Sequence, residues 1–103
     1  MRVIERKMNE AITASKDWSL DNTEVINEDG VSIVKLYGNK IAEVGDTWLR
    51  IYDGGYRSVT TKSRLNAILR AHGNGEGVYQ KKFEWFFYDV NGERPFESGL
   101  LLD

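Results

Sequence analysis

The chain has 103 residues, a hydrophobic fraction of 41%, a formal net charge of −2 and no cysteine. This length is typical of one hydrophobic core, and we expect residues 1–103 to fold as a single domain. The lack of cysteine excludes disulfides, thiolate catalysis and thiolate metal sites. There is no apolar run of about 18 residues and no signal-peptide pattern, so we expect a soluble, cytoplasmic protein without a membrane partner.

The first residues have the spacing of an amphipathic helix. Ile4, Met8, Ala11 and Ile12 fall on one helical face, and charged or polar residues fill the other. This periodicity fades near residues 15–17, where we expect the helix to end.

From Thr23 onward the hydrophobic period becomes two, which is typical of β-strands. Three tight-turn signals divide this stretch at even spacing: Asp29-Gly30, Gly38-Asn39 and Gly45-Asp46. The pattern predicts an antiparallel meander of four strands. We expect these strands over residues 23–27, 31–37, 40–44 and 47–52.

A second helix is predicted after residue 59. Thr60 or Thr61 supplies a hydroxyl that can cap its free amides, and Gly73 is well placed to end it in a left-handed conformation. The stretch between Tyr56 and His72 carries basic residues and no Asp or Glu, although the rest of the chain is acidic. Positive charge is therefore concentrated in this part of the sequence.

The strand pattern returns after a glycine-rich loop. Residues 79–88 alternate but carry aromatic side chains on both faces, so we expect this strand to be covered on both sides or bulged midway. Asn91-Gly92 predicts a type I′ hairpin turn, and Pro95 in the return strand belongs on a sheet edge. If Trp85 faces inward, Phe86 and Tyr88 face outward.

These elements predict an α+β fold in which two helices pack on an antiparallel meander sheet. The expected order is α-β-β-β-β-α-β-β(-β), with the last strand formed by Leu100, Leu101 and Leu102.

Several segments of the chain resemble a family of small proteins encoded by tailed bacteriophages, often marine ones. The resemblance is carried by residues 36–42, 53–56, 60–68 and 79–86, and it covers roughly residues 31–99. It implies a phage origin and expression inside an infected bacterium, in the host cytoplasm. It implies no catalytic residue.

The start of the second helix is the main candidate site. Free amides at a helix N-terminus attract anions, and hydroxyls and cations would strengthen this attraction. The site would bind a phosphate of nucleic acid or a carboxylate of a partner protein, and the alternative is a capped helix with solvated cations. Its candidate residues are Arg57, Thr60, Thr61, Lys62, Ser63, Arg64 and Arg70.

The aromatic strand is a second candidate site. Its outward residues Phe86 and Tyr88, with Lys81 and Lys82 beside them, would offer a stacking platform for bases or an interface for a protein. The alternative is that these aromatic residues belong to the core.

Catalytic and metal sites have little support in the sequence. The chain has a single histidine, and Asp29, Asp46 and Asp53 stand in glycine-rich turns that favour aspartate for conformational reasons. We therefore expect no metal, no cofactor and no enzymatic activity. A small hydrolase or nuclease built on Asp17, Asp53 and His72 is the least favoured interpretation.

The sequence thus predicts a non-enzymatic binding module, a phage accessory protein that binds a host or phage protein or a second copy of itself. The alternative is a nucleic-acid-binding protein that uses the basic helix over residues 60–70.

Overall fold

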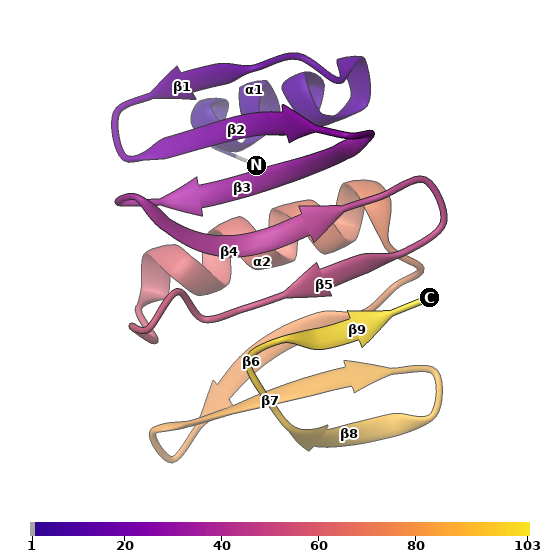
Figure 1. Cartoon of the computed structure of the whole chain (residues 1–103). Helices are drawn as coiled ribbons and strands as arrows, with labels where there is room; N and C mark the ends of the chain where they lie inside the picture. Colours follow the sequence, from indigo (N-terminus) through magenta and orange to yellow (C-terminus); the bar gives the residue numbers. More distant parts are fainter. Residues whose placement is uncertain (1) are drawn as a thin grey trace.

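The computed structural model describes residues 2–103 and contains two antiparallel sheets (Figure 1). The order in the larger sheet is β1-β2-β3-β4-β5-β9, and the smaller sheet has the order β6-β7-β8. The helices are α1 (Val3–Ala14) and α2 (Val59–His72). The strands are β1 (Trp18–Leu20), β2 (Thr23–Glu28), β3 (Val31–Leu36), β4 (Asn39–Val44), β5 (Leu49–Ile51), β6 (Gly77–Lys81), β7 (Glu84–Asp89), β8 (Gly92–Pro95) and β9 (Leu100–Leu102).

The predicted α+β class and the order of its elements are confirmed. Two strands are additions to this order. The strand β1 has only three residues, too few to give an alternation signal, and the one strand predicted over residues 79–88 is divided into β6 and β7. Leu100–Leu102 forms a strand, as expected, and it pairs with β5 at the far edge of the larger sheet.

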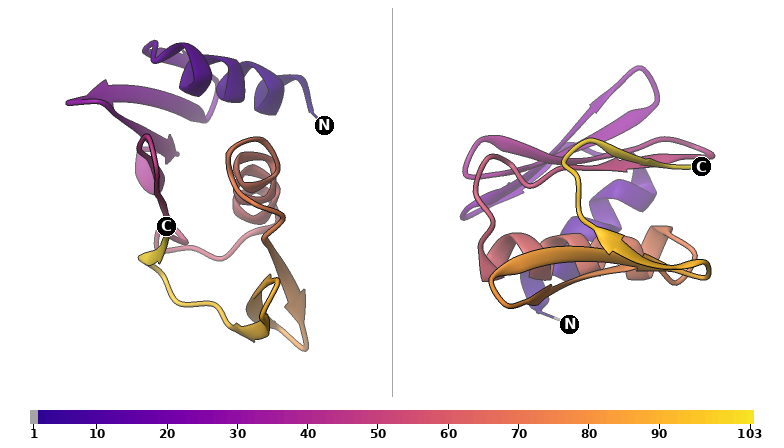
Figure 2. Two further views of the ribbon diagram at one scale, coloured as in Figure 1. Left: turned by 90° about the vertical axis from the view of Figure 1, so that its right-hand side faces the viewer. Right: turned by 90° about the horizontal axis from the view of Figure 1, so that it is seen from below.

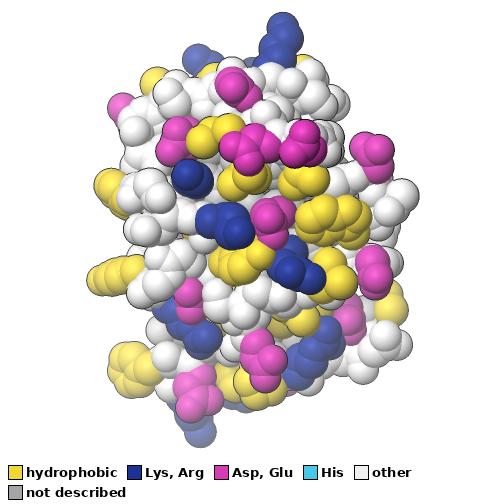
Figure 3. Space-filling view, viewed as in Figure 1, with side chains coloured by type: hydrophobic (Ala, Val, Ile, Leu, Met, Phe, Trp, Pro, Cys, Tyr) yellow, Lys and Arg dark blue, Asp and Glu magenta, His cyan; other side chains and the backbone are white. Residues whose placement is uncertain are grey.

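Both helices lie on one face of the larger sheet, and the smaller sheet lies next to α2 at one end of the molecule (Figures 1 and 2). The core between these layers is apolar and includes Met8, Ile12, Val25, Val34, Ile41, Ile51, Leu65, Ile68, Leu69, Trp85 and Phe87. Within residues 2–103 no helix covers the opposite face of the larger sheet. Figure 3 shows acidic, basic and apolar side chains interspersed on that open face, so it presents no field of one sign.

The two helices end differently from one another. Helix α1 ends at Ala14, next to the predicted stop near residues 15–17. Ser15 takes the left-handed conformation, and its N–H donates a hydrogen bond to the Ile12 carbonyl. Gly73 after α2 is extended with φ −95°, so the expected left-handed stop is wrong. The glycine is needed for space, because a Cβ there would lie 2.7 Å from the backbone carbonyl oxygen of Leu69.

The N-cap of α2 is Ser58, and the prediction of Thr60 or Thr61 is wrong. The Ser58 hydroxyl accepts a hydrogen bond of 3.1 Å from the N–H of Thr61. The helix begins at Val59, so Ser58 has the spacing that lets a cap reach the third helical amide.

Two hairpin turns lie one residue earlier than predicted. The turn between β3 and β4 is Tyr37-Gly38 rather than Gly38-Asn39, and Val90-Asn91 replaces Asn91-Gly92 between β7 and β8. In the first of these turns glycine takes the second position at φ 78°, as type I′ geometry favours. The Asp29-Gly30 turn is confirmed.

Residues 79–88 form a hairpin, whereas the sequence predicted one strand that is covered twice or bulged. Strands β6 and β7 pair with Lys81 opposite Glu84, and the turn between them is Lys82-Phe83. Neither turn residue is a usual turn former, so this turn has no signature in the amino-acid composition. Pro95 lies on β8, which pairs only with β7 and is therefore an edge strand as predicted.

Asn66 joins helix α2 to the smaller sheet. Its side-chain amide donates to the Val78 carbonyl at 2.9 Å and accepts from the Val78 N–H at 2.8 Å. The amide therefore pairs with the edge of β6 as a neighbouring strand would, and it fixes this sheet relative to the helix.

Candidate functional site

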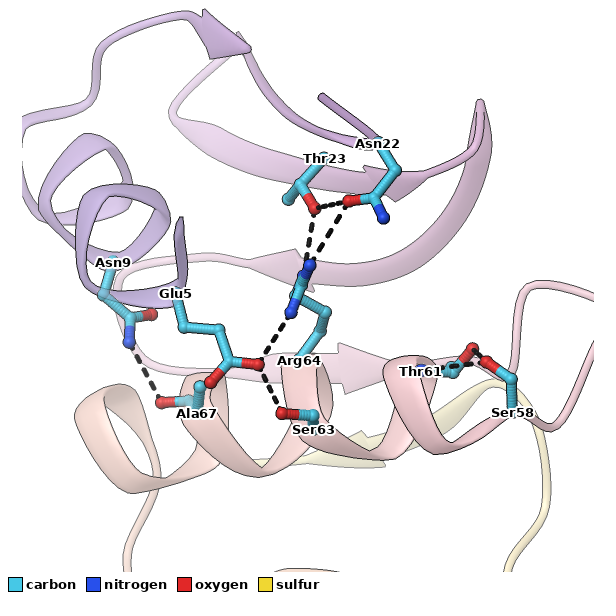
Figure 4. Close-up of polar contacts among 9 residues, drawn as sticks. All are labelled: Glu5, Asn9, Asn22, Thr23, Ser58, Thr61, Ser63, Arg64 and Ala67. Carbon is cyan, nitrogen blue, oxygen red and sulfur yellow. Dashed lines mark hydrogen bonds and ion pairs between the residues drawn. The ribbon is translucent and has the colours of Figure 1, made fainter. Parts of the chain in front are cut away.

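The basic start of α2 is largely consumed by contacts inside the fold (Figure 4). Arg64 is 3% exposed, and its guanidinium lies 2.8 Å from Glu5 of α1. It also donates to Thr23 Oγ1 at 3.0 Å and to Asn22 Oδ1 at 3.3 Å. Arg64 therefore ties both helices to β2 and is not available to an external anion, which corrects its assignment as a surface candidate.

The hydroxyl groups of this segment also have internal partners. Ser63 donates to Glu5 Oε2 at 2.5 Å, and the buried Thr61 donates to the Tyr56 carbonyl at 3.1 Å. Both residues were candidates for anion binding, and the structure instead uses them to fix the two helices and the loop before α2. Figure 4 shows the same pattern for the Ser58 cap.

Arg57 packs against the smaller sheet. Its guanidinium carbon lies 5.6 Å from the Trp85 ring centroid and 5.3 Å from that of Phe96, and its Nε is 3.2 Å from Asp53. Burial raises the pKa of Asp53, but hydrogen bonds from the Gly55 N–H and Arg57 outweigh this effect and lower it. Arg57 thus serves an internal ion pair and a cation–π contact.

The remaining candidate cations of α2 lie apart from one another. The Lys62 ammonium donates to Gln80 Oε1 at 3.0 Å, next to the smaller sheet. Arg70 is exposed in the last turn of the helix. The structure therefore does not bring the predicted cations together at the helix N-terminus.

A pocket of about 390 Å³ lies beside the start of α2 and includes the half-buried Thr60 in its lining. Asp53 is the sole charged residue that lines this pocket. A carboxylate in the lining repels a phosphate or carboxylate ligand, so the pocket gives no support to an anion site. Its lining residues are Leu36, Tyr37, Asn39, Ile41, Asp53, Gly54, Tyr56, Ser58, Thr60 and Thr61.

The smaller sheet carries three aromatic rings on its outward side, which we name the aromatic face: Tyr79, Phe86 and Tyr88. The Tyr79 ring stacks on Phe86 with centroids 5.6 Å apart, and it lies 6.1 Å from the Tyr88 ring. Trp85 and Phe87 are buried on the inward side of β7, the strand that carries Phe86 and Tyr88. The predicted outward orientation of Phe86 and Tyr88 is therefore confirmed.

Tyr79 was not among the sequence-predicted site residues. The pairing of β6 with β7 would have identified it. With the turn at Lys82-Phe83, Tyr79 stands directly opposite Phe86. A prediction of one continuous strand hides this pairing.

Two neighbours fix the rings of the aromatic face. A Cβ at Gly77 would collide with the Tyr88 hydroxyl, so the glycine leaves room for that ring to lie across β6. The Tyr79 hydroxyl donates to the Glu93 carboxylate, and this hydrogen bond raises the pKa of Tyr79 above its usual range. Tyr79 is therefore neutral at physiological pH and is held in place by Glu93.

The charges around the aromatic face are of both signs. Lys81 and Lys82 are exposed at the end of β6, as expected for surface candidates. Glu84 stands opposite Lys81, and Glu93 stands opposite Tyr88. The face therefore combines an apolar surface with mixed charge, which is the composition of many protein interfaces.

His72 gives the fold a pH-dependent stability. Burial lowers the pKa of the imidazole, so the unfolded chain binds a proton in a range where the folded chain does not. We expect stability to fall as the pH drops through the ordinary histidine pKa of about 6.5 toward the lowered value. Urea unfolding between these pH values should show this slope, and His72→Gln should remove it. An unchanged slope would contradict the assignment, because the chain has one histidine.

Within residues 2–103 the acidic candidates of the metal and hydrolase alternatives have partners inside the fold. No group of three His, Asp or Glu side chains there could hold a metal ion. Asp17 accepts hydrogen bonds from Asn27, and Asp53 is paired with Arg57. Neither helix in this range is both long and apolar enough to cross a membrane.

Comparison with protein families gives one match. The family model described as Kyanoviridae Gp96 protein matches residues 1–103. No curated protein and no solved structure matches the chain.

Proposed function

The chain belongs to the Kyanoviridae Gp96 protein family, a family of phage-encoded proteins, and we propose that it is a non-enzymatic module whose aromatic face binds a protein of the phage or its host. The proposal rests on one observation, the outward cluster of Tyr79, Phe86 and Tyr88 on the smaller sheet.

Aromatic rings at a surface supply large apolar contact area at low cost in side-chain entropy. Tyr88 is 43% exposed, and Phe86 is partly exposed beside it. The two rings stand on β7, whose other side is anchored in the core by Trp85 and Phe87. The cluster is therefore rigid before binding, which reduces the free energy that a partner must spend on ordering it.

Nucleic-acid binding has less support than protein binding. Affinity for nucleic acid scales with the number of phosphates that cations neutralise. Arg64 is buried, and Arg57 in the loop before α2 is paired with Asp53, so the helix and this loop together offer few free charges. On the aromatic face, Glu84 and Glu93 offset the nearby lysines.

Capture of proteins from a lysate of phage-infected bacteria tests the proposal. We expect Tyr88→Ala to lower the amount of the captured partner by about tenfold or more, because exposed aromatic residues dominate binding energy at interfaces. Tyr37→Ala is the matched control, since Tyr37 is an exposed tyrosine on a turn of the larger sheet. Quantitative mass spectrometry of the captured proteins measures both effects.

Two outcomes would overturn the proposal. One is equal capture by the wild type and by Tyr88→Ala. The other is capture of DNA or RNA that is lost steeply as salt increases, which would place the nucleic-acid alternative first.

A further inference from the structure

The turn between β6 and β7 has an unusual composition for its backbone conformation. Lys82 and Phe83 both have positive φ, at 51° and 68°, which is the geometry of a type I′ turn. The turns Asp29-Gly30 and Tyr37-Gly38 share this geometry, and both have glycine in the second position. In this turn phenylalanine occupies the position that glycine takes in the other two.

The left-handed conformation is unfavourable for a bulky residue, because Cβ crowds the following carbonyl oxygen. The fold gains nothing visible in return, since Phe83 is 95% exposed. A strained backbone and an apolar ring in water at one residue are two separate costs. Strain of this kind is retained where a function requires it.

Around the Lys82-Phe83 turn, which we name the tip, positive charges outnumber negative ones. Lys81 and Lys82 are exposed on one side of Phe83, and Lys62 of α2 reaches Gln80 one residue further back. Glu84 is the sole acidic residue within this group. The tip therefore presents one apolar ring flanked by two lysines and one glutamate.

We propose that Phe83 is an anchor that inserts into an apolar pocket of a partner protein, and that carboxylates border this pocket and pair with Lys81 and Lys82. The inference rests on the proposed protein-binding function, but it concerns a different contact from the aromatic face. The chemistry of the partner surface is inferred from the shape and charge of the tip, because interacting surfaces are complementary in both.

A protein pocket fits the tip better than the other two surfaces that use aromatic and basic groups. Stable attachment to a membrane needs more than one short apolar insertion with two lysines beside it. Single-stranded nucleic acid stacks successive bases on several platforms, and the tip offers a single ring.

Two substitutions at the tip separate binding from folding. We expect Phe83→Gly to raise the unfolding temperature by about 3 °C, because it relieves the left-handed strain, while capture of the partner falls about tenfold or more. Phe83→Ala should lose the partner equally without this rise, since it removes the ring and keeps a Cβ. Retained capture by both variants would overturn the anchor.

Photo-crosslinking tests the chemistry of the pocket. The probe is p-benzoylphenylalanine in place of Phe83, and the same probe in place of Tyr37 is the control. We expect a crosslink from position 83 to one partner protein, at an apolar site flanked by Asp or Glu. Crosslinks to many proteins, or binding of vesicles of phosphatidylglycerol that Phe83→Gly abolishes, would overturn the inference.

The two proposals fail in different ways. Loss of the partner in Tyr88→Ala but not in Phe83→Ala would overturn the anchor and leave the aromatic face intact. The reverse result would overturn the aromatic face and leave the anchor, and capture of no protein by the wild type would overturn both.

Discussion

Replacement of Glu5 by alanine is expected to lower the free energy of unfolding by about 3–5 kcal/mol, because it leaves the charge of Arg64 buried without its counter-ion. Both side chains are about 4% exposed, and their charged atoms lie 2.8 Å apart. Domains of this size are stable by about 5–15 kcal/mol, so the loss is a large part of the total. Urea unfolding monitored by circular dichroism measures it.

Glu10→Ala in the same helix is the matched control. Glu10 pairs with Arg6 at 3.1 Å, but both side chains are 59% exposed. An exposed pair four residues apart on a helix contributes about 0.3–0.5 kcal/mol. If Glu5→Ala lowers the free energy of unfolding no more than Glu10→Ala does, the buried pair does not hold the two helices together.

A double replacement distinguishes the pair itself from the cost of breaking it. Glu5→Met with Arg64→Met removes both charges, and we expect it to recover much of the stability that Glu5→Ala loses. Recovery should be incomplete, because Ser63 and Thr23 lose the partners to which they are now bonded. A double variant as unstable as Glu5→Ala would show that the hydrogen bonds, and not the unpaired charge, dominate.

Arg64 also shows where sequence reasoning reaches its limit. The local sequence places it in a stretch without acids, and this suggested a solvent-exposed basic patch. Its counter-ion stands 59 residues earlier, on another helix. A charge pattern along the chain cannot reveal such a pair, because the pair exists only after the two helices pack.

The parts of the fold that were predicted correctly depend on local periodicity. The helical spacing of Met8 and Ile12 and the alternation of Trp85 with Phe86 report which side of an element is buried. These patterns were sufficient for the order of elements and for the outward side of β7. They were insufficient for the Lys82-Phe83 turn, where the residues oppose the conformation that they adopt.

Phe83 and Arg64 are opposite cases of how residue type relates to solvent exposure. Arg64 has the composition of a binding residue but acts in folding. Phe83 has the composition of a core residue but is displayed to solvent. In both cases the exposed fraction, which the sequence does not give, decides the interpretation.

Replacement of Trp85 by alanine is the second large expected effect, with a loss of about 3–5 kcal/mol. Trp85 is 2% exposed, and its ring meets Phe96 edge-on with centroids 5.5 Å apart. The same ring lies below the guanidinium of Arg57, so alanine removes a cation–π contact and leaves a cavity where the smaller sheet packs. Thermal and urea unfolding measure the loss.

Trp85→Phe should cost much less than Trp85→Ala. The indole N–H is buried and has no hydrogen-bond acceptor among the described residues, so phenylalanine keeps most of the apolar contact and removes an unsatisfied donor. Equal losses for the two variants would mean that the indole has a partner that matters. Because Trp85 anchors the inward side of β7, whose outward side carries Phe86, Trp85→Ala should also weaken partner capture. If the aromatic face acts as a rigid platform, this weakening should appear at temperatures where the variant is still folded.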